Sequence, residues 1–336
     1  MKVLVIAMPG MGNTILTIPL IRTLKQNFPN IQIDLLVGLK SSKLIMEDCP
    51  YLNKIYQIDQ KINKSTLSAL YRLNKEKYDI SFTTFPAKQT QYNVLAKIIN
   101  AKRRITHNYR SNLVKLQNIR IPIKITHDIK QNLNLLKPFN LENSPSELEL
   151  WPVHKKSIKK SKNFIIGIHP GSSIERGMIK KRWPPKYFSK LIGLLSEDFK
   201  DLEVRLYLGP AEKELAIIKE ISKNPEKISI IDQGLKETVE SISQCNLFIS
   251  NDSGLMHIAA AQKVPTVGIF LSTDERRTFP FYEKRLILKN GVPHLFFRQN
   301  IERLSGVKKM IIQKNINIIK PEEAIKEIRL FISKLK

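Results

Sequence analysis

The chain has 336 residues, which is more than one average domain needs, so two domains are the expected organisation. A hydrophobic content of 42% and a charged content of 26% exclude a disordered chain and predict a soluble globular protein. The formal net charge of +26 leaves two explanations open: a polyanionic partner, such as nucleic acid, anionic lipid or an acidic glycolipid, or the lysine-rich composition of an A/T-rich coding sequence.

Short apolar runs alternate with helical patterns along nearly the whole chain. In the first half we expect strands at 2–7, 31–38, 54–59, 78–84 and 103–107, and helices at 14–27 and 89–99. In the second half we expect strands at 163–170, 202–210, 227–232, 245–252 and 264–270, and helices at 185–195, 211–222 and 321–336. This alternation predicts an α/β protein whose parallel sheets carry helices on both faces.

The stretch 140–162 separates the two halves, because it is polar, contains Pro and Lys, and shows no periodicity. We therefore expect two Rossmann-like domains, 1–150 and 151–336. No apolar run reaches the roughly 18 residues of a membrane span, and the first one is too short for a signal peptide. Cys49 and Cys245 show neither disulfide nor metal-ligand spacing, which predicts a reducing, cytoplasmic location.

Ligands of such sheets bind beyond the carboxyl ends of the strands, where this chain places its unusual polar residues. After the first strand, the turn Gly10-Met11-Gly12 leads to Asn13 at the expected start of a helix. A strand, a glycine turn and a helix start predict a site for a phosphate or a reacting group. Asn13 is an amide, which neither takes nor gives a proton. The alternative is that Asn13 only caps the helix.

Three stretches of the second half suit a phosphorylated ligand. Ser172 and Ser173 follow a strand and precede the basic loop 180–182, a combination that fits a diphosphate unless the lysines are merely solvated. Asp252, Ser253 and Gly254 open a helix that carries His257 one turn later, although Asp252 alone could be a simple N-cap. Glu212 starts another helix, where it could accept hydrogen bonds from a sugar or serve only as a first-turn acid.

Other motifs are absent from the sequence or incomplete. The turn Gly10-x-Gly12 lacks the third glycine of a dinucleotide fingerprint, whose position holds Ile15. The sequence contains no phosphate-loop lysine, no His-Glu-x-x-His motif and no Asp-x-Asp pair of the metal-dependent sugar transferases. We therefore expect no metal and no cofactor.

Five stretches, taken in order, resemble glycosyltransferase family 9, the heptosyltransferase family of lipopolysaccharide biosynthesis. They are "GMGNTILTIPLIRTLK", "HDIKQNLNLL", "HPGSS…KKRWPPKYFSKL", "GPAEKE" and "FISNDSGLMHIAAAQKVPTVGIF". The resemblance implies a GT-B fold, in which two Rossmann-like domains with parallel sheets face an interdomain cleft. It also implies an inverting, metal-independent transfer from a nucleotide-activated sugar, ADP-heptose in the best-known members.

The resemblance also implies roles for particular residues. In the donor-binding domain, 151–336, Ser172, Ser173 and Lys181 hold the diphosphate, Glu212 meets the ribose or sugar, and Asp252, Ser253, Gly254 and His257 bind the heptose and phosphates. In the acceptor-binding domain, 1–150, we expect Gly12, Lys88, Arg104 and Arg110, with Arg103 beside them, to meet an acidic glycan or glycolipid. The expected protein acts in the cytoplasm, in peripheral contact with an anionic membrane, and does not bind nucleic acid.

Two positions depart from the family pattern. The family has Asp, the proposed general base, where this chain has Asn13, and its "GPTD" loop reads "LSTD" at 271–274. Asn13 can orient the acceptor hydroxyl while water or another group, with His107 as the candidate, takes the proton. Alternatively the acceptor is acidic enough to need little help, or the chain is an inert nucleotide-sugar or glycan-binding relative. We favour the first interpretation, because the donor-side residues are all present.

Overall fold

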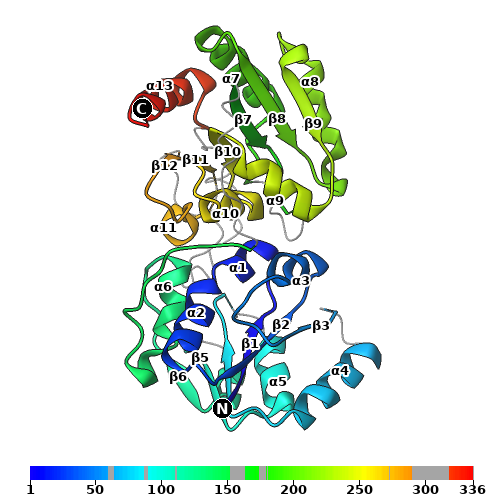
Figure 1. Cartoon of the computed structure of the whole chain (residues 1–336), viewed down its shortest axis with the longest axis vertical. Coiled ribbons are helices and arrows are strands. Elements are labelled where there is room, and N and C mark those ends of the chain that lie inside the picture. Colours follow the sequence, from blue (N-terminus) through cyan, green and yellow to red (C-terminus); the bar gives the residue numbers. More distant parts are fainter. Residues whose placement is uncertain are drawn as a thin grey trace, which may run out of the picture. The chain divides into compact units, whose positions relative to one another are not determined.

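The computed structural model describes residues 1–59, 64–86, 90–109, 112–151, 163–173, 179, 181–271, 273–289 and 318–335. The chain divides into two compact units, Met1–Val153 and His154–Lys336, and each is described by itself (Figure 1). Among the described helices, none combines the length and the apolar character needed to cross a membrane.

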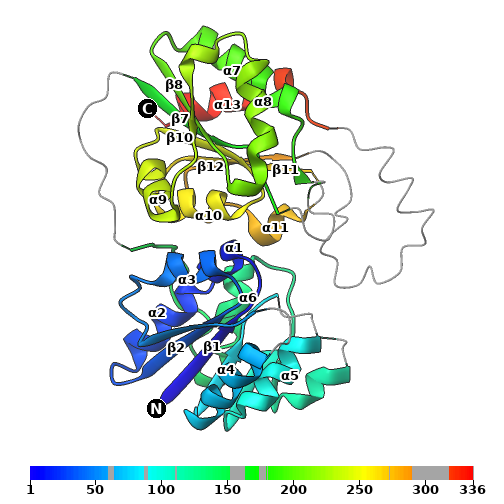
Figure 2. The same cartoon turned by 90° about the vertical axis from the view of Figure 1, so that its right-hand side faces the viewer.

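Unit 1 contains a parallel six-stranded sheet in the order β3-β2-β1-β4-β5-β6. Its strands are β1 (Lys2–Ala7), β2 (Gln32–Val37), β3 (Lys54–Gln57), β4 (Ile80–Thr83), β5 (Arg103–His107) and β6 (Ile119–Ile121). Its helices are α1 (Met11–Ile15), α2 (Ile18–Asn27), α3 (Lys40–Met46), α4 (Lys64–Lys75), α5 (Thr90–Ile99) and α6 (Asp128–Asn134). Helices α2 and α3 cover one face of the sheet and α4 and α5 the other (Figure 2). Residues 3–7 of strand β1 form a continuous apolar run because both faces of the strand are covered.

Unit 2 repeats this arrangement with the order β12-β11-β10-β7-β8-β9, again all parallel. Its strands are β7 (Phe164–His169), β8 (Leu202–Tyr207), β9 (Ile228–Ile231), β10 (Leu247–Asn251), β11 (Thr266–Phe270) and β12 (Arg285–Lys289). Its main helices are α7 (Pro185–Asp198), α8 (Ile217–Glu220), α9 (Leu235–Ser243), α10 (Gly254–Ala261), α11 (Glu275–Thr278) and α13 (Pro321–Ser333). A 3-10 helix, Pro210–Ala216, precedes α8. The two parallel sheets confirm the predicted α/β class.

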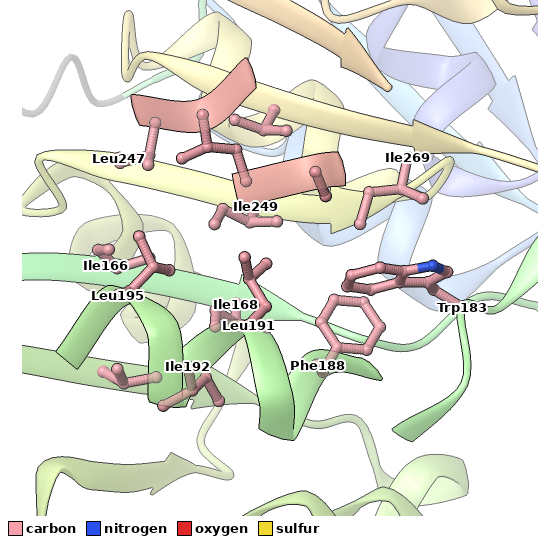
Figure 3. Close-up of a cluster of buried hydrophobic side chains, with 14 of the residues drawn as sticks. Ile166, Ile168, Trp183, Phe188, Leu191, Ile192, Leu195, Leu247, Ile249 and Ile269 are labelled. Atoms are coloured by element: carbon pink, nitrogen blue, oxygen red, sulfur yellow. The ribbon is translucent and has the colours of Figure 1, made fainter. Parts of the chain in front are cut away.

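The core of unit 2 lies between its sheet and helices α7 and α13. Ile166 and Ile168 of β7 pack with Leu191 and Leu195 of α7, and Trp183 is fully buried beside Phe188, as Figure 3 shows. The Trp183 and Phe188 rings meet edge to face with their centroids 5.1 Å apart. The indole nitrogen of Trp183 donates to the carbonyl of Ile319 at 2.8 Å. This packing fixes the described residues just before α7, which include Lys181 and Arg182.

Both sheets share the strand order of a dinucleotide-binding fold, and this order decides where a ligand can bind. The connections reverse direction between β1 and β4 in unit 1 and between β7 and β10 in unit 2. Loops that leave the carboxyl ends of such a strand pair diverge to opposite faces and leave room between them. The expected site in each unit is therefore formed by the loops after these two strands.

The structure corrects some predicted elements. Ten of the twelve described strands correspond to predicted strands, whereas the edge strands β6 and β12 have no predicted counterpart. The helix expected at 14–27 is interrupted between α1 and α2, because Pro19 has no amide hydrogen to bond the carbonyl four residues earlier. The helix expected at 211–222 is the 3-10 helix Pro210–Ala216 followed by the short α8.

Candidate functional site

The loops after β7 and β10 form the site in unit 2. His169, near the end of β7, is paired in register with Ser250 near the end of β10, so the segments 170–173 and 252–254 begin side by side. These segments and the loop before α7 bring together the predicted donor residues. Ser172 is buried and Ser173 is exposed beyond the end of β7.

Lys181 and Asp252 form a largely buried ion pair. The Lys181 ammonium donates to Oδ2 of Asp252 at 2.9 Å, with 15% and 6% of the two side chains exposed. Burial by itself would raise the pKa of the Asp252 carboxyl, but attraction to Lys181 and the hydrogen bond from it outweigh burial, so the pKa lies below its usual value. The Asp252 carboxyl is therefore ionised at neutral pH, and the pair fixes the ammonium beside the start of α10.

Helix α10 begins at the carboxyl end of β10 without a side-chain cap. Its N-cap is Ser253 and not Asp252, so the alternative of Asp252 as a simple N-cap is wrong. The Ser253 hydroxyl makes no capping bond and lies 3.0 Å from the hydroxyl of Ser250. The first amides of any helix have no carbonyl partner within the helix and attract anions. Ser253 and Gly254 are half-buried, so a ligand can approach these amides.

His257 lies one turn into α10 and is buried. Its Nδ1 has no hydrogen-bond partner within the described part of the chain. Burial lowers the pKa of His257 to about 4, and the nearby Asp252 carboxylate, which by itself would raise this pKa, only partly offsets the effect. The ring is therefore neutral at pH 7. An unpaired buried nitrogen costs about 1–3 kcal/mol, which a ligand or a bound water would recover.

The lowered pKa of His257 predicts a pH-dependent stability. Below pH 6.5 the unfolded chain binds a proton on this ring, whereas the folded chain does so only near pH 4. The free energy of unfolding should therefore fall as the pH falls across this window, by about 3 kcal/mol at most. Denaturant unfolding at several pH values measures the slope.

The matched variant for this measurement is His257→Asn, which keeps a polar side chain but cannot titrate. Its free energy of unfolding should fall less steeply than that of the wild type between pH 6.5 and pH 4, and the two slopes should differ by about 1.4 kcal/mol per pH unit at most. His169 remains in both proteins, so its own lowered pKa, caused mainly by burial, cancels in the comparison. Equal slopes would show that His257 is protonated in the folded protein well above pH 4.

Glu212 closes the other side of this site. Its Oε2 accepts from the amide of Gly209 at 2.9 Å, and the carboxylate lies against the backbone of Gly171 after β7. A Cβ on Gly171 would come within 1.9 Å of this carboxylate, so glycine is needed there for the close approach. Glu212 is therefore a first-turn acid of the 3-10 helix and also a neighbour of the loop that carries Ser172.

Two residues of this site received no role of their own in the sequence analysis. Arg182 donates to the carbonyl of Ser172 at 2.7 Å and pairs with Glu214 at 2.9 Å, and so clamps the loop after β7. Asn251 is fully buried, accepts from the amide of Trp183 at 3.0 Å and donates to the carbonyl of Pro170. Asn251 thereby ties both loops to β10. Their place beside Lys181 and Asp252 in the sequence was the only signal that could have identified them.

In unit 1, Asn13 is the third residue of α1, beyond the carboxyl end of β1. The N-cap of α1 is Gly10, so the alternative in which Asn13 caps the helix is wrong. Asn13 is half-buried, and no side-chain hydrogen bond is recorded for it in the described structure. A Cβ added to Gly10 would meet nothing within 4 Å, so the described packing does not require a glycine there. Both observations fit a surface left open for a substrate. Gly12, also in α1, belongs to the same turn.

Asn132 of α6 is a further residue that the sequence did not predict. It is buried, accepts from the amide of Phe85 after β4 at 2.8 Å, and donates to the carbonyl of Leu16 after α1 at 3.0 Å. It therefore connects the end of α1 to the loop that leaves β4. Asn132 plays in unit 1 the part that Asn251 plays in unit 2.

The structure does not support two of the expected roles in unit 1. His107 ends β5 fully buried, with Nε2 3.0 Å from the carbonyl of Gln131 and its ring packed edge to face on Phe85, so it cannot reach an acceptor hydroxyl as a base. Arg104 lies in the amino-terminal half of β5, and its guanidinium donates to the carbonyls of Ala101 and Leu116.

The remaining acceptor residues cannot be placed in the same way. Arg103 opens β5 and is exposed, so it too lies at the edge opposite the expected ligand site. Lys88 and Arg110 lie outside the described residues. Of the acceptor residues expected from the sequence, Gly12 is thus the one that the described structure places beside Asn13.

The described residues provide no cluster of three or more His, Cys, Asp or Glu side chains that could hold a metal ion. A solved structure with the same fold, the iron-containing dodecameric glycosyltransferase TibC from enterotoxigenic E. coli, contains iron by its own description. Its TM-score is 0.58 at 11% identity, and the match covers 99% of this chain and 79% of TibC.

Known proteins resemble this chain over most of its length. Lipopolysaccharide heptosyltransferase 3 of Escherichia coli K12 is 28% identical over 285 residues, which are 78% of this chain and 80% of the relative. Lipooligosaccharide heptosyltransferase 2 of Campylobacter jejuni serotype O:6 is 28% identical over 336 residues, which are 98% of each protein. The solved structure of E. coli ADP-heptose lipopolysaccharide heptosyltransferase II matches with a TM-score of 0.71 at 18% identity and covers 99% of both chains.

The structural match confirms the predicted GT-B-like fold of two Rossmann-like units. Residues 68–305 match the model of glycosyltransferase family 9 (heptosyltransferase), which is more than half of the chain. The relatives named above act, by their names, on lipopolysaccharide and lipooligosaccharide. The chain therefore belongs to glycosyltransferase family 9, the heptosyltransferase family of lipopolysaccharide and lipooligosaccharide biosynthesis.

Proposed function

We propose that this glycosyltransferase moves a heptose from ADP-heptose to an acidic sugar of a lipopolysaccharide-type acceptor, with inversion at the anomeric carbon. In this proposal unit 2 binds the donor and unit 1 binds the acceptor. The observation that carries the proposal is the cluster in unit 2, where Lys181 is fixed by Asp252 beside the uncapped start of α10. The unpaired Nδ1 of His257 in the same helix supports it.

The donor site supplies what the leaving group needs. The acceptor oxygen forms a bond to the anomeric carbon while the bond from that carbon to the phosphate oxygen breaks, and ADP leaves with the electron pair. Negative charge therefore develops on the diphosphate. The Lys181 ammonium and the first amides of α10 are already oriented to stabilise this charge, and preorganised groups of this kind contribute strongly to catalysis.

On the acceptor side, Asn13 orients the nucleophile in this proposal. Its carbonyl oxygen accepts a hydrogen bond from the acceptor hydroxyl, and its NH₂ group donates one to a second sugar oxygen. The hydroxyl proton passes to water, since the buried His107 is not available to take it. Gly10 lets the acceptor approach the backbone closely.

A catalytically inert nucleotide-sugar-binding protein is the second candidate function. The observation that favours it is Asn13 itself, which stands where the family has a carboxylate. Such a protein would bind ADP-heptose but would form no ADP with any acceptor.

Calorimetric titration with ADP-heptose, and with UDP-, GDP- and CMP-sugars as controls, tests the donor assignment. We expect ADP-heptose to bind most tightly and to raise the melting temperature, because a ligand of the folded state stabilises it by mass action. Equal affinity for all four nucleotide sugars, or none for ADP-heptose, would contradict the proposal.

We further propose that transfer needs no metal ion, because Lys181 and the α10 amides take the place of a cation at the diphosphate. Sugar transfer should proceed at the wild-type rate in excess EDTA, measured as ADP released with the acceptor present. Added Mg²⁺, Mn²⁺ or Fe²⁺ should not accelerate it. Activity that is lost with the chelator and restored by one of these ions would show that the leaving group depends on a metal.

A further inference from the structure

Helices α4 and α5 expose large apolar side chains on unit 1. Leu67 and Tyr71 on α4 are 54% and 62% exposed, and Ile98 on α5 is 44% exposed. Leu67 and Tyr71 are four residues apart, so they share one face of α4, whereas Leu70 and Leu73 are buried in the core. The packing of unit 1 therefore leaves an apolar strip on the outer side of α4.

Exposed cations surround these apolar side chains. They are Arg72, Lys75, Lys77 and Lys97, and within the described residues none of them pairs with a carboxylate. The two nearby acids are already engaged, since Glu76 pairs with Lys2 and Asp79 with Lys102. The Lys75 ammonium lies 4.5 Å from the centre of the Tyr71 ring. The surface is therefore both apolar and strongly basic.

Hydrogen bonds show that these residues form one continuous surface. The Asn74 amide of α4 donates to the carbonyl of Ile98 at the end of α5 at 2.8 Å. The same amide lies 3.4 Å from the carbonyl of Ile99, so the last turns of the two helices lie side by side. Figures 1 and 2 both draw α4 next to α5. We call the exposed side chains of 67–77 and 97–98 the α4–α5 surface.

We propose that the α4–α5 surface docks on an anionic phospholipid bilayer. Basic side chains attract anionic headgroups, and apolar side chains such as Leu67 and Ile98 enter the interface between headgroups and acyl chains. A nucleic acid would engage the cations but would leave Leu67 and Ile98 in water. This proposal rests on the proposed function in one respect, because the glycolipid acceptor of that function is held in a bilayer.

Vesicle sedimentation of the full-length chain tests this proposal. The wild type should bind vesicles of phosphatidylcholine mixed with phosphatidylglycerol and should not bind phosphatidylcholine alone. The triple variant Arg72→Gln/Lys75→Gln/Lys97→Gln should lower the partition coefficient about a hundredfold, because each lost cation weakens binding about fivefold. The control Lys223→Gln/Lys284→Gln/Lys326→Gln removes the same charge from exposed positions of unit 2 and should change binding only slightly.

High salt separates the apolar contribution to vesicle binding from the electrostatic contribution. Salt screens the cations but not the apolar contacts, so Leu67→Ser/Ile98→Ser should weaken the binding that remains at high ionic strength. Equal losses in the two triple variants, no binding of the wild type to anionic vesicles, or a loss of nucleic-acid binding instead of vesicle binding would overturn the proposal.

Sugar transfer to a water-soluble fragment of the acceptor measures catalysis without membrane docking. The triple variant of the α4–α5 surface should act on this fragment at the wild-type rate, since its changed residues lie outside the donor cluster and the Asn13 turn. A wild type that binds vesicles but transfers no sugar would contradict the proposed function and leave docking supported. A triple variant that loses the soluble reaction would show that the surface serves the active site itself and would overturn docking.

Discussion

Replacing Asn13 by alanine is expected to lower sugar transfer by about a hundredfold or more while leaving ADP-heptose affinity unchanged, because misplacing a nucleophile has effects of this size. Asn13 does not cap α1, and no side-chain hydrogen bond is recorded for it in the described structure. Its removal should therefore leave the melting temperature unchanged. Transfer kinetics, donor calorimetry and thermal unfolding of one variant measure the three quantities.

Two further substitutions separate orientation from proton transfer. Asn13→Ser keeps a hydrogen-bonding group but shortens its reach, so it should behave like Asn13→Ala. Asn13→Asp supplies a base at the same place and should stay active or gain activity, with a rate that falls as the carboxylate is protonated at low pH. Wild-type transfer by Asn13→Ala would show that the acceptor hydroxyl is oriented elsewhere.

Replacing Lys181 by alanine is expected to weaken ADP-heptose binding by about 1.5–3 kcal/mol, which is the range for a hydrogen bond to a charged group. The same change leaves the Asp252 carboxylate buried without its partner, and breaking a buried pair in this way costs roughly 3–5 kcal/mol of stability. Calorimetry of the folded variant and denaturant unfolding measure the two effects.

The double variant Lys181→Met/Asp252→Asn separates the two effects. It removes both charges, so it should recover much of the lost stability. It should not recover donor affinity if the ammonium binds the diphosphate. Full donor affinity in this double variant would show that Lys181 serves only to hold Asp252 in place.

The strand-end rule brings together the residues expected at the donor site, whereas it misplaces some of those expected at the acceptor site. Ser172 and Asp252 are far apart in the sequence, but β7 and β10 are neighbours, so their carboxyl ends bring these residues together. Arg104 also lies in a predicted strand, yet its guanidinium bonds the carbonyls of Ala101 and Leu116, contacts that the sequence pattern could not indicate. His107 does end its strand, but contacts with Phe85 and Gln131 bury it.

The residues that the sequence did not reveal are those whose partners lie far along the chain. Asn132 bonds the carbonyl of Leu16 at a separation of 116 residues, and Asn251 bonds the amide of Trp183 at a separation of 68 residues. No local pattern identifies such contacts. The edge strands β6 and β12 were missed for a local reason, because an edge strand is covered on fewer sides and tolerates charged residues such as Arg120 and Arg285.

The most direct test of the central claim is to incubate the wild-type protein with ADP-heptose and a lipopolysaccharide acceptor truncated before its heptoses. Released ADP and the mass of the acceptor are then measured in the same sample. We expect one ADP for each heptose added, and no ADP when the acceptor is omitted. Donor binding by calorimetry without any acceptor-dependent ADP would contradict transfer and identify the chain as a binding protein of the same fold.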